Sequence, residues 1–401
     1  MFCCNAHAMT KRLRIAVLTR NFVSTGGGAE RYAIAIVKGL APRHDIHVFS
    51  QTADRALDGV TYHRVPYPLS RSRWMNQVYF AAATWWATRQ GFDIVHSHEN
   101  TWHGNVQTVH VLPIKHNLFF DKHGAYRLMR WLKVLTSPRL IAYLWLEGKR
   151  YDMHGGRRVV LTSNSLRGVM QSSYPQTQAV LEVVPPGVAS VPGLATDAQR
   201  AVARAELGLP LKGICLLFVG NDCRKKGLPA LIRALRLMPA DTCVAVVSNS
   251  SQLDDLRQEA RERGMEKRVH FLGALADMST AYIAADLLAH PTLEDTFAMV
   301  VLEAMSHGLP VVVSGPQFCG IAGDLHHGRD AMLVKNPRDE QELSDHIMTV
   351  LSDPQLAGAL SAGGVQFANR LSWETAAIRY EQIYGEVAAG VAGVKSLNGI
   401  P

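Results

Sequence analysis

The stretch from His290 to Pro310, HPTLEDTFAMVVLEAMSHGLP, carries carboxylates at a spacing that suits nucleotide binding. Asp295 precedes an apolar block that predicts a helix from about Phe297, and Glu303 lies about two turns into that helix. A helix N-terminus offers free N–H groups and a positive dipole end, which favour a diphosphate. Glu303 is placed to accept hydrogen bonds from two vicinal hydroxyls, as a ribose presents them. The spacing alone equally allows Asp295 to be only a helix cap and Glu303 to be a solvated carboxylate.

A basic loop lies in the segment Phe218–Gly227, FVGNDCRKKG. The apolar run before the loop predicts a strand that ends at Gly220, and a helix is expected to follow. Arg224, Lys225 and Lys226 therefore lie where cations can neutralise a leaving diphosphate. Taken alone, such a segment is more often a solvated basic turn.

Two weaker signals lie in the first third of the chain. The segment Thr25–Arg31, TGGGAER, contains three glycines whose backbone can approach a ligand closely, although such a cluster is more often just a turn. His110 ends the strand-like run Gln107–Val111, QTVHV. A single histidine among 17 would more often be structural.

A possible metal site at His96 and His98 is a weaker hypothesis. The run His96-Ser97-His98-Glu99 places two imidazoles on one side of a predicted strand end. No third ligand follows at a recognisable spacing, so we expect no metal and favour a role in lining a ligand site.

The carboxylate segment resembles the Glu-x7-Glu signature of retaining glycosyltransferases of family 4, which have the GT-B fold. Members commonly read E-x-F-G-x-x-x-x-E-A-M-A-x-G-x-P; here Asp295 begins DTFA and Glu303 begins EAMSHGLP. The first carboxylate is an aspartate, unless Glu294 takes that role through a shift of one residue. Ala298 replaces the usual glycine and tightens the space beside the phosphates.

Further segments are similar to the same family. Lys226 matches the lysine in V-G-x-x-x-x-K-G, and its partner cation is either Arg224 or Lys225. The glycine cluster, with Gly27 and Gly28, resembles the family's G-G-x-E-R loop, and His110 matches a T-x-H segment. VVPPGV at 183–188 and LSWETAAIRYEQIY at 371–384 resemble its domain boundary and closing helix, so the resemblance covers about residues 13–388.

The resemblance implies retaining transfer of a hexose from a nucleotide-diphosphate sugar, here expected to be a UDP-sugar, with no cofactor and no metal. Lys226 and its neighbouring cation would stabilise the leaving diphosphate. Glu303 would hold the ribose, Asp295 would contact hydroxyls of the transferred sugar, and His110 would lie near that sugar. The donor-binding set would also include the amides of Phe297, Ala298, Met299 and Val300. The pattern looks most like bacterial lipopolysaccharide core glucosyltransferases, which implies a glycolipid or other glycan acceptor.

Alternating apolar runs and helical stretches must position these residues. This order predicts two Rossmann-like parallel α/β/α domains that face a central cleft. We expect an N-terminal domain at 1–186, closed by a helix at 373–388, and a C-terminal nucleotide-sugar domain at 187–372. Strands are expected at 13–19, 46–50, 94–97, 107–111 and 158–162, and then at 214–220, 243–248, 269–272, 287–290 and 311–314.

The composition excludes several classes of protein. The chain has 401 residues, of which 47% are hydrophobic and 19% charged, so it is not a disordered chain. No apolar run approaches the length of a membrane span, and neither the dinucleotide fingerprint nor a Walker-type loop occurs. Six cysteines without a C-x-x-C pair suit a reducing cytoplasm, and the N-terminus does not read as a signal peptide. Residues 1–8 are a candidate non-native extension before Met9.

The net charge of +8 is concentrated between Lys115 and Arg158, where ten basic residues face three acidic ones. The same segment is rich in aromatic residues, and Tyr126–Leu135 has a helical apolar face flanked by Arg127, Arg130 and Lys133. Rings interleaved with cations suit an anionic bilayer interface. We therefore predict peripheral docking on the inner face of the cytoplasmic membrane; the alternative is that the rings pack inside the first domain.

Three other functions remain open from the sequence. A chain of this fold can be a sugar-nucleotide epimerase or hydrolase that needs no acceptor. It can also be a non-catalytic binding protein, which Lys226 and Glu303 argue against. A basic nucleic-acid-binding protein is the third, but no RNA- or DNA-binding motif accompanies the basic segment, so we expect no nucleic acid.

Overall fold

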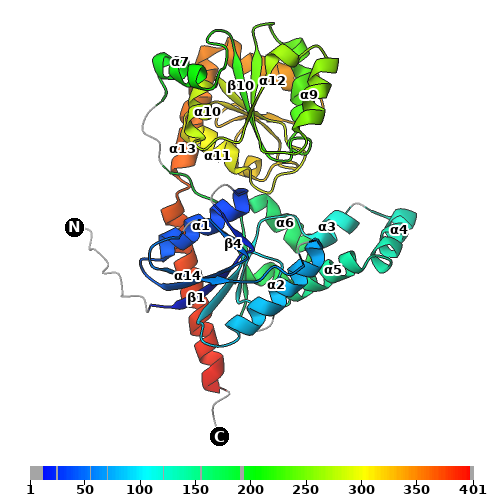
Figure 1. Ribbon diagram of the computed structural model, residues 1–401, viewed down its shortest axis with the longest axis vertical. Helices are drawn as coiled ribbons and strands as arrows, with labels where there is room; N and C mark the ends of the chain where they lie inside the picture. The colour runs from blue at the N-terminus through cyan, green and yellow to red at the C-terminus, as the bar shows by residue number, and fades with distance from the viewer. Residues whose placement is uncertain are drawn as a thin grey trace, which may run out of the picture. The chain divides into compact units, whose positions relative to one another are not determined.

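The computed structural model describes residues 12–23, 26–54, 56–69, 71–120, 122–153, 156–189 and 194–397. Cys3, Cys4, Thr25, Asp121 and the proposed extension at 1–8 lie outside these ranges. The chain divides into two compact units (Figure 1). Unit 1 comprises Met1–Thr162, Leu166–Val184 and Trp373–Pro401, and unit 2 comprises Ser163–Ser165 and Pro185–Ser372. The predicted boundaries lie at 186 and 372.

Unit 1 contains a seven-stranded parallel sheet in the order β5-β3-β1-β6-β7-β8-β9. The chain starts in the middle of the sheet, moves to one edge and then returns past β1 to the other edge. Apolar residues fill the central strands, as expected for a parallel sheet covered on both faces. Its strands are β1 Arg14–Leu18, β3 Asp45–Ser50, β5 Val60–Arg64, β6 Ile94–Ser97, β7 Val106–Val109, β8 Arg158–Leu161 and β9 Leu181–Val183, beside a small pair, β2 Asn21–Phe22 and β4 Thr52–Ala53.

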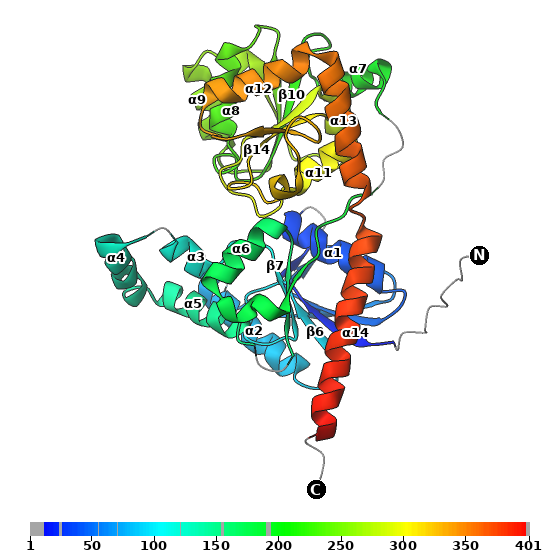
Figure 2. The same cartoon turned by 180° about the vertical axis from the view of Figure 1, so that it is seen from behind.

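The helices of unit 1 include one from the far end of the sequence. They are α1 Gly28–Leu40, α2 Arg73–Thr88, α3 Ile114–Phe119, α4 Gly124–Leu135, α5 Pro138–Arg150, α6 Asn164–Ser173 and α14 Trp373–Leu397. Figures 1 and 2 show α14, in red, running beside α1. Its Tyr384 hydroxyl lies 2.7 Å from Nδ1 of His96, and its Tyr380 hydroxyl lies 2.7 Å from Oγ1 of Thr108. These buried polar contacts fix the C-terminal helix to β6 and β7.

Unit 2 contains a six-stranded parallel sheet in the order β12-β11-β10-β13-β14-β15. Its strands are β10 Cys215–Val219, β11 Cys243–Val247, β12 Val269–Gly273, β13 Leu287–His290, β14 Val311–Ser314 and β15 Met332–Val334. Its helices are α7 Asp197–Glu206, α8 Leu228–Ala234, α9 Leu253–Glu262, α10 Ser279–Ala284, α11 Met299–Ser306, α12 Glu340–Ser352 and α13 Pro354–Asn369. Helices cover both faces of this sheet (Figure 2). The predicted fold class of two parallel α/β/α domains is confirmed.

The strands that the sequence analysis left out lie at the edges of the sheets. β5 and β9 end the sheet of unit 1, and β15 ends that of unit 2. β5 reads VTYHR with half-exposed side chains, and β9 and β15 have only three residues each. A run of three residues is too short to predict a strand, and β5 lacks the continuous apolar run that marks a central strand of a parallel sheet.

Within the described residues, no helix is both long and apolar enough to span a membrane. Four of the cysteines, Cys215, Cys223, Cys243 and Cys319, are buried free thiols.

Candidate functional site

The central feature of unit 2 is the meeting of two loops at the carboxyl ends of adjacent strands. β10 and β13 pair directly, although α8, β11, α9, β12 and α10 lie between them in the sequence. The strand order reverses between these two strands, and ligands of open parallel sheets bind at such a switch point. The loop after β10 carries Lys226, and the loop after β13 carries Asp295.

Gly227 allows these two loops to approach one another. Its φ is +87°, a conformation that side chains disfavour, and a Cβ atom added there would lie 1.9 Å from the carbonyl oxygen of Pro291. Nearby, the N–H of Leu293 donates to the carbonyl of Lys225 at 2.8 Å. The glycine after Lys226 is therefore a packing requirement that sets the position of the lysine.

Two consecutive lysines form ion pairs with two consecutive carboxylates: Lys225 with Glu294, and Lys226 with Asp295. Lys226 Nζ lies 2.6 Å from Asp295 Oδ2 and also donates to the carbonyl of Glu294 at 3.1 Å. Lys225 Nζ lies 2.6 Å from Glu294 Oε1. The Lys226–Asp295 pair is the more buried, with side chains 21% and 16% exposed against 42% and 36% for Lys225–Glu294. Arg224 contacts Glu259 of α9 instead, at 3.6 Å.

Asp295 also accepts two backbone N–H groups directly before helix α11. Its Oδ1 accepts the N–H of Ala298 at 2.9 Å and that of Phe297 at 3.3 Å. The sequence analysis assigned both amides to the donor; in this structure both donate to the Asp295 carboxylate, and their role toward the donor stays a prediction. Met299 and Val300 form the first turn, where N–H groups have no intrahelical partner.

His290, the last residue of β13, is a contact of Asp295 that sequence reasoning missed. Its Nε2 lies 3.3 Å from Asp295 Oδ2, and the ring is almost fully buried. Burial opposes ionisation of Asp295, but the hydrogen bond from His290 and the charge of Lys226 hold the pKa of that carboxyl well below its ordinary value. A polar residue at the end of an apolar strand was the signal available in the sequence.

Ala298 adopts a left-handed conformation with φ +73° and ψ +71°. Among the described residues it is the only non-glycine with a positive φ. This conformation is costly for a residue with a Cβ atom, which explains why the family pattern has glycine at this position. Ala298 is therefore a strained residue directly before helix α11.

Glu303 lies inside helix α11 and has a neighbour that the sequence did not reveal. The hydroxyl of Tyr282, in α10, donates to Glu303 Oε2 at 2.7 Å. Tyr282 is buried, and its ring lies 4.9 Å from that of His307, centroid to centroid. The tyrosine therefore holds the carboxylate that is predicted to bind a ribose.

In unit 1, His110 follows β7 and lies, half-buried, against His98. Its Nε2 lies 2.9 Å from Nδ1 of His98, and the two rings stack with an interplanar angle of 15°. Burial, and next the charge of Arg150, lower the pKa of His110 to about 3, so the ring is neutral. His110 is thus fixed as a neutral polar group at the carboxyl end of β7.

Hydrogen bonds within unit 1 engage the ring of His96. Both ring nitrogens of His96 are occupied, by Tyr384 and by Thr108 at 2.7 Å each. No three histidine, cysteine or acidic side chains gather as metal ligands within the described ranges.

The glycine cluster precedes helix α1, with Gly27 at the N-cap and Gly28 as the first helical residue. A Cβ atom at Gly26 would lie 2.9 Å from the carbonyl of Val23, so the turn requires glycine there. Gly27, Gly28 and His110 belong to unit 1, and the remaining predicted site residues belong to unit 2.

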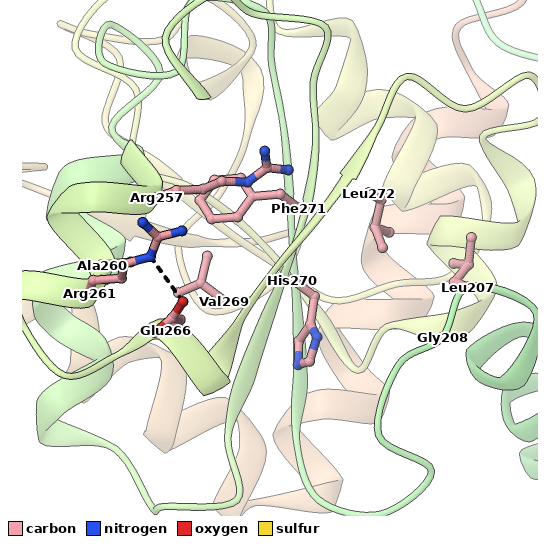
Figure 3. Close-up of a pocket in the computed structure, with 10 residues that line it drawn as sticks. All are labelled: Leu207, Gly208, Arg257, Ala260, Arg261, Glu266, Val269, His270, Phe271 and Leu272. Carbon is pink, nitrogen blue, oxygen red and sulfur yellow. Dashed lines mark hydrogen bonds and ion pairs between the residues drawn. The ribbon is translucent and has the colours of Figure 1, made fainter. Parts of the chain in front are cut away.

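Cavity size does not identify this site. A cavity of about 420 Å³ in unit 2 lies along edge strand β12 and helix α9 (Figure 3). It is lined by Arg257, Arg261, Glu266 and His270 among others, and none of the predicted donor residues takes part. The site is defined by the strand-end loops and their ion pairs.

Two family models match the chain, and both describe glycosyltransferases. Residues 26–190 match Glycosyltransferase Family 4, and residues 213–353 match Glycosyl transferases group 1. The chain therefore contains a segment of the Glycosyltransferase Family 4 type followed by one of the Glycosyl transferases group 1 type.

Curated relatives and solved structures are similar to large parts of the chain. D-inositol 3-phosphate glycosyltransferase of Corynebacterium aurimucosum is 31% identical over 57% of this chain and 56% of its own length. Lipopolysaccharide glucosyltransferase WaaG of Escherichia coli is 25% identical over 59% of this chain and 63% of its own length. The matched region thus spans little more than half of these relatives.

Crystal structures show the fold over nearly the whole chain. WaaG superposes with a TM-score of 0.79 at 20% identity, covering 92% of this chain and 99% of that one. HepE of Anabaena, in complex with UDP and glucose, superposes with a TM-score of 0.69 at 20% identity and the same coverage. The predicted GT-B fold is confirmed.

Proposed function

We propose that this protein is a retaining hexosyltransferase that uses a nucleotide-diphosphate sugar, with UDP as the nucleotide. The observation that carries the proposal is the Lys226–Asp295 pair at the switch point of unit 2, directly before helix α11. The UDP complexes of HepE and the names of the sequence relatives support the choice of donor and reaction.

In the proposed reaction, the bond between the sugar's anomeric carbon and the diphosphate oxygen breaks while the acceptor hydroxyl forms a new bond on the same face. Lys226, with Lys225 or Arg224, stabilises the negative charge that develops on the diphosphate. The acceptor's proton passes to the departing diphosphate. Glu303, held by Tyr282, accepts hydrogen bonds from the ribose hydroxyls.

We assign Asp295 to the transferred sugar and place His110 beside it. Both oxygens of Asp295 are engaged, one by Lys226 and one by the amides of Phe297 and Ala298. A hydrogen bond from a sugar hydroxyl adds to this set, since each carboxylate oxygen accepts more than one hydrogen bond. The chemistry proposed uses these side chains and amides alone, without a cofactor or metal.

An epimerase or hydrolase on the same fold makes a different prediction about the acceptor. The test measures UDP release from UDP-glucose, UDP-galactose and UDP-N-acetylglucosamine with and without an acceptor. Suitable acceptors are a lipopolysaccharide core fragment and inositol 3-phosphate. A transferase releases UDP much faster with one of these acceptors, whereas equal release without any acceptor would favour hydrolysis.

We further propose that unit 1 docks on the cytoplasmic face of an anionic membrane through helices α4 and α5. Helix α4 projects from the rest of unit 1 (Figures 1 and 2) and contacts α3 and α5. Only Val134 of α4 is buried, and Tyr126 is 73% exposed. Apolar side chains exposed in this number mark an interaction surface. Exposed large side chains here are Phe120, Tyr126, Leu128, Met129, Trp131, Leu132, Leu135, Ile141 and Trp145.

Cations on the same helix favour a membrane as the partner. Arg127 and Lys133 are exposed and Arg130 is half-buried, beside the apolar residues of α4. Each lysine or arginine near anionic lipid contributes about 1 kcal/mol to the free energy of membrane binding. Tryptophan and tyrosine rings favour the level of the lipid headgroups. A lipid-linked acceptor would then be presented at the surface where the enzyme is bound.

Vesicle co-sedimentation tests this docking. The wild type should bind phosphatidylglycerol vesicles at low salt, bind less at high salt, and ignore phosphatidylcholine. The triple variant Arg127→Glu/Arg130→Glu/Lys133→Glu should lose binding. The matched control, Lys267→Glu/Lys335→Glu/Arg338→Glu, makes the same charge change at exposed sites of unit 2 and should keep it. A wild type that ignores anionic vesicles at low salt would refute the proposal.

A further inference from the structure

Unit 1 contains a cavity near the amino ends of its strands, whereas His110 lies at the carboxyl end of β7. This cavity of about 360 Å³ lies between the end of α2 and the segments that lead into β7 and β8. Trp85, Arg89, His103, Asn105 and Arg157 contribute to its lining. His110 follows the carboxyl end of β7, whereas these segments precede the amino ends of β7 and β8. The cavity is therefore separate from the residues assigned to the donor.

His103 is the unusual residue in this cavity. Its side chain is only 9% exposed, yet neither ring nitrogen has a hydrogen-bond partner among the described residues. Burial, and next the charge of Arg157, lower the pKa of His103 to about 3, so the ring is neutral and carries one donor and one acceptor. Leaving both unsatisfied is costly, and an apolar residue would fill the same space without that cost. A ligand that pairs with the ring removes the penalty.

Two arginines give the cavity a positive charge. The Nη atoms of Arg157 donate to the carbonyls of Trp102 at 2.8 Å, Lys149 at 2.8 Å and Asp152 at 2.9 Å, which fixes the guanidinium rigidly. The Asp152 carboxylate acts on Arg157 electrostatically and also contacts Lys149 Nζ at 3.8 Å.

Arg89 is exposed and lies over the ring of Trp86, 3.6 Å from its centroid. The neighbouring Trp85 is 44% exposed and lines the cavity. The Arg89 guanidinium, held against an aromatic face, is a group suited to bind a phosphate.

We propose that this cavity binds a phosphate group carried on a small polar skeleton, with His103 and Arg89 as its contacts and Arg157 as a fixed positive charge. The volume lies within the range of small-molecule sites. The same chemistry is offered by the glycerophosphate headgroup of a lipid and by a soluble phosphomonoester. The inference goes beyond the proposed function and does not depend on it.

Calorimetric titration with glycerol 3-phosphate tests the site, and glycerol provides the matched uncharged probe. We expect saturable 1:1 binding of glycerol 3-phosphate and none of glycerol. Arg89→Gln should weaken binding about tenfold or more, because a charge-assisted contact is lost. The control Arg73→Gln removes an exposed arginine from the other end of α2 and should bind as the wild type does.

His103→Leu separates a ligand role from a packing role. The variant should remain folded, with a melting temperature equal to or above that of the wild type, and should lose glycerol 3-phosphate binding. Arg89→Gln keeps the test valid if His103→Leu does not fold, since Arg89 is exposed. No saturable binding by the wild type, or unchanged binding in Arg89→Gln, would overturn the proposal.

Vesicles distinguish the two sources of the phosphate. If Arg89→Gln and His103→Leu also weaken binding to phosphatidylglycerol vesicles, the ligand is a lipid headgroup. If vesicle binding is unchanged while glycerol 3-phosphate binding is lost, the ligand is a soluble phosphomonoester. Either vesicle result supports a phosphate site, whereas the titrations of wild type and Arg89→Gln with glycerol 3-phosphate decide whether the site exists.

Discussion

Lys226 Nζ lies 2.6 Å from Oδ2 of Asp295, and the other oxygen of the same carboxylate accepts the N–H of Ala298, the residue directly before helix α11. One aspartate therefore joins the cation of the β10 loop to the start of the helix after β13. A diphosphate that binds Lys226 meets a lysine already oriented by a carboxylate, so the group needs little reorganisation to act on developing negative charge.

The two candidate carboxylates should respond differently to neutralisation. Asp295→Asn should reduce the rate of UDP release strongly and lower the free energy of unfolding by about 1–3 kcal/mol, because the half-buried Lys226 loses its charged partner. Glu294→Gln breaks a more exposed pair and should cost less than about 1 kcal/mol. Turnover and urea unfolding check both effects. A larger loss of activity in Glu294→Gln would show that the signature is shifted by one residue.

Ala298→Gly should stabilise the protein by about 0.5–1 kcal/mol. Glycine removes the penalty of about 1–2 kcal/mol for a left-handed residue, and its greater unfolded-state entropy offsets part of that gain. The control Ala304→Gly, inside α11 and fully buried, should destabilise by about 1 kcal/mol. Urea midpoints of the two variants should move in opposite directions; equal destabilisation would argue against strain at Ala298.

Tyr282→Phe should raise the KM for the donor several-fold and leave kcat nearly unchanged. The substitution removes the hydroxyl that donates to Glu303, and Glu303 is proposed to hold the ribose and not the reacting atoms. Losing one such hydrogen bond costs about 1 kcal/mol. Steady-state kinetics separates the two constants. A fall in kcat with an unchanged KM would place Glu303 elsewhere in the mechanism.

Unit 1 should lose stability as the pH falls below about 6.5. Burial lowers the pKa of His96, His103 and His110 to about 3, whereas unfolded histidines titrate near 6.5. Between these values the unfolded state binds more protons, so acid favours unfolding, by up to about 1.4 kcal/mol per pH unit for each histidine. The stabilisation that comes from keeping these histidines neutral is fully present above about pH 6.5.

Tryptophan fluorescence can follow this effect, because all seven tryptophans lie in unit 1. The urea midpoint should fall between pH 7 and pH 5. The fall should be smaller in His103→Leu, which removes one of the titrating groups. A midpoint that is the same at both pH values would contradict neutral buried histidines.

The encounter of the two strand-end loops was predictable from the sequence. Central parallel strands appear as continuous apolar runs, and polar or basic residues that follow them gather at one edge of the sheet. Lys226 and Asp295 follow β10 and β13 in this way, although 68 residues separate them. A family resemblance added their roles, which the spacing alone left open.

The partners of these residues were not predictable. Tyr282 meets Glu303 through tertiary packing, and nothing in its local sequence marks it as a site residue. His290, which meets Asp295, carries only the weak signal of a polar residue at the end of an apolar strand. The aromatic residues of the basic segment show the same limit. Helical periodicity predicted an apolar face on Tyr126–Leu135, but only the three-dimensional packing shows that α4 leaves this face exposed.

The most direct test of the account is the rate of UDP release, with acceptor, in Lys226→Ala and in the control Lys212→Ala, which removes an exposed lysine of the same unit. Lys226→Ala should reduce the rate by about 10²–10³ while circular dichroism shows a folded protein, because one charge-assisted contact to the leaving diphosphate is lost. Lys212→Ala should retain wild-type turnover. Near-wild-type turnover in folded Lys226→Ala would contradict the assignment of the donor site.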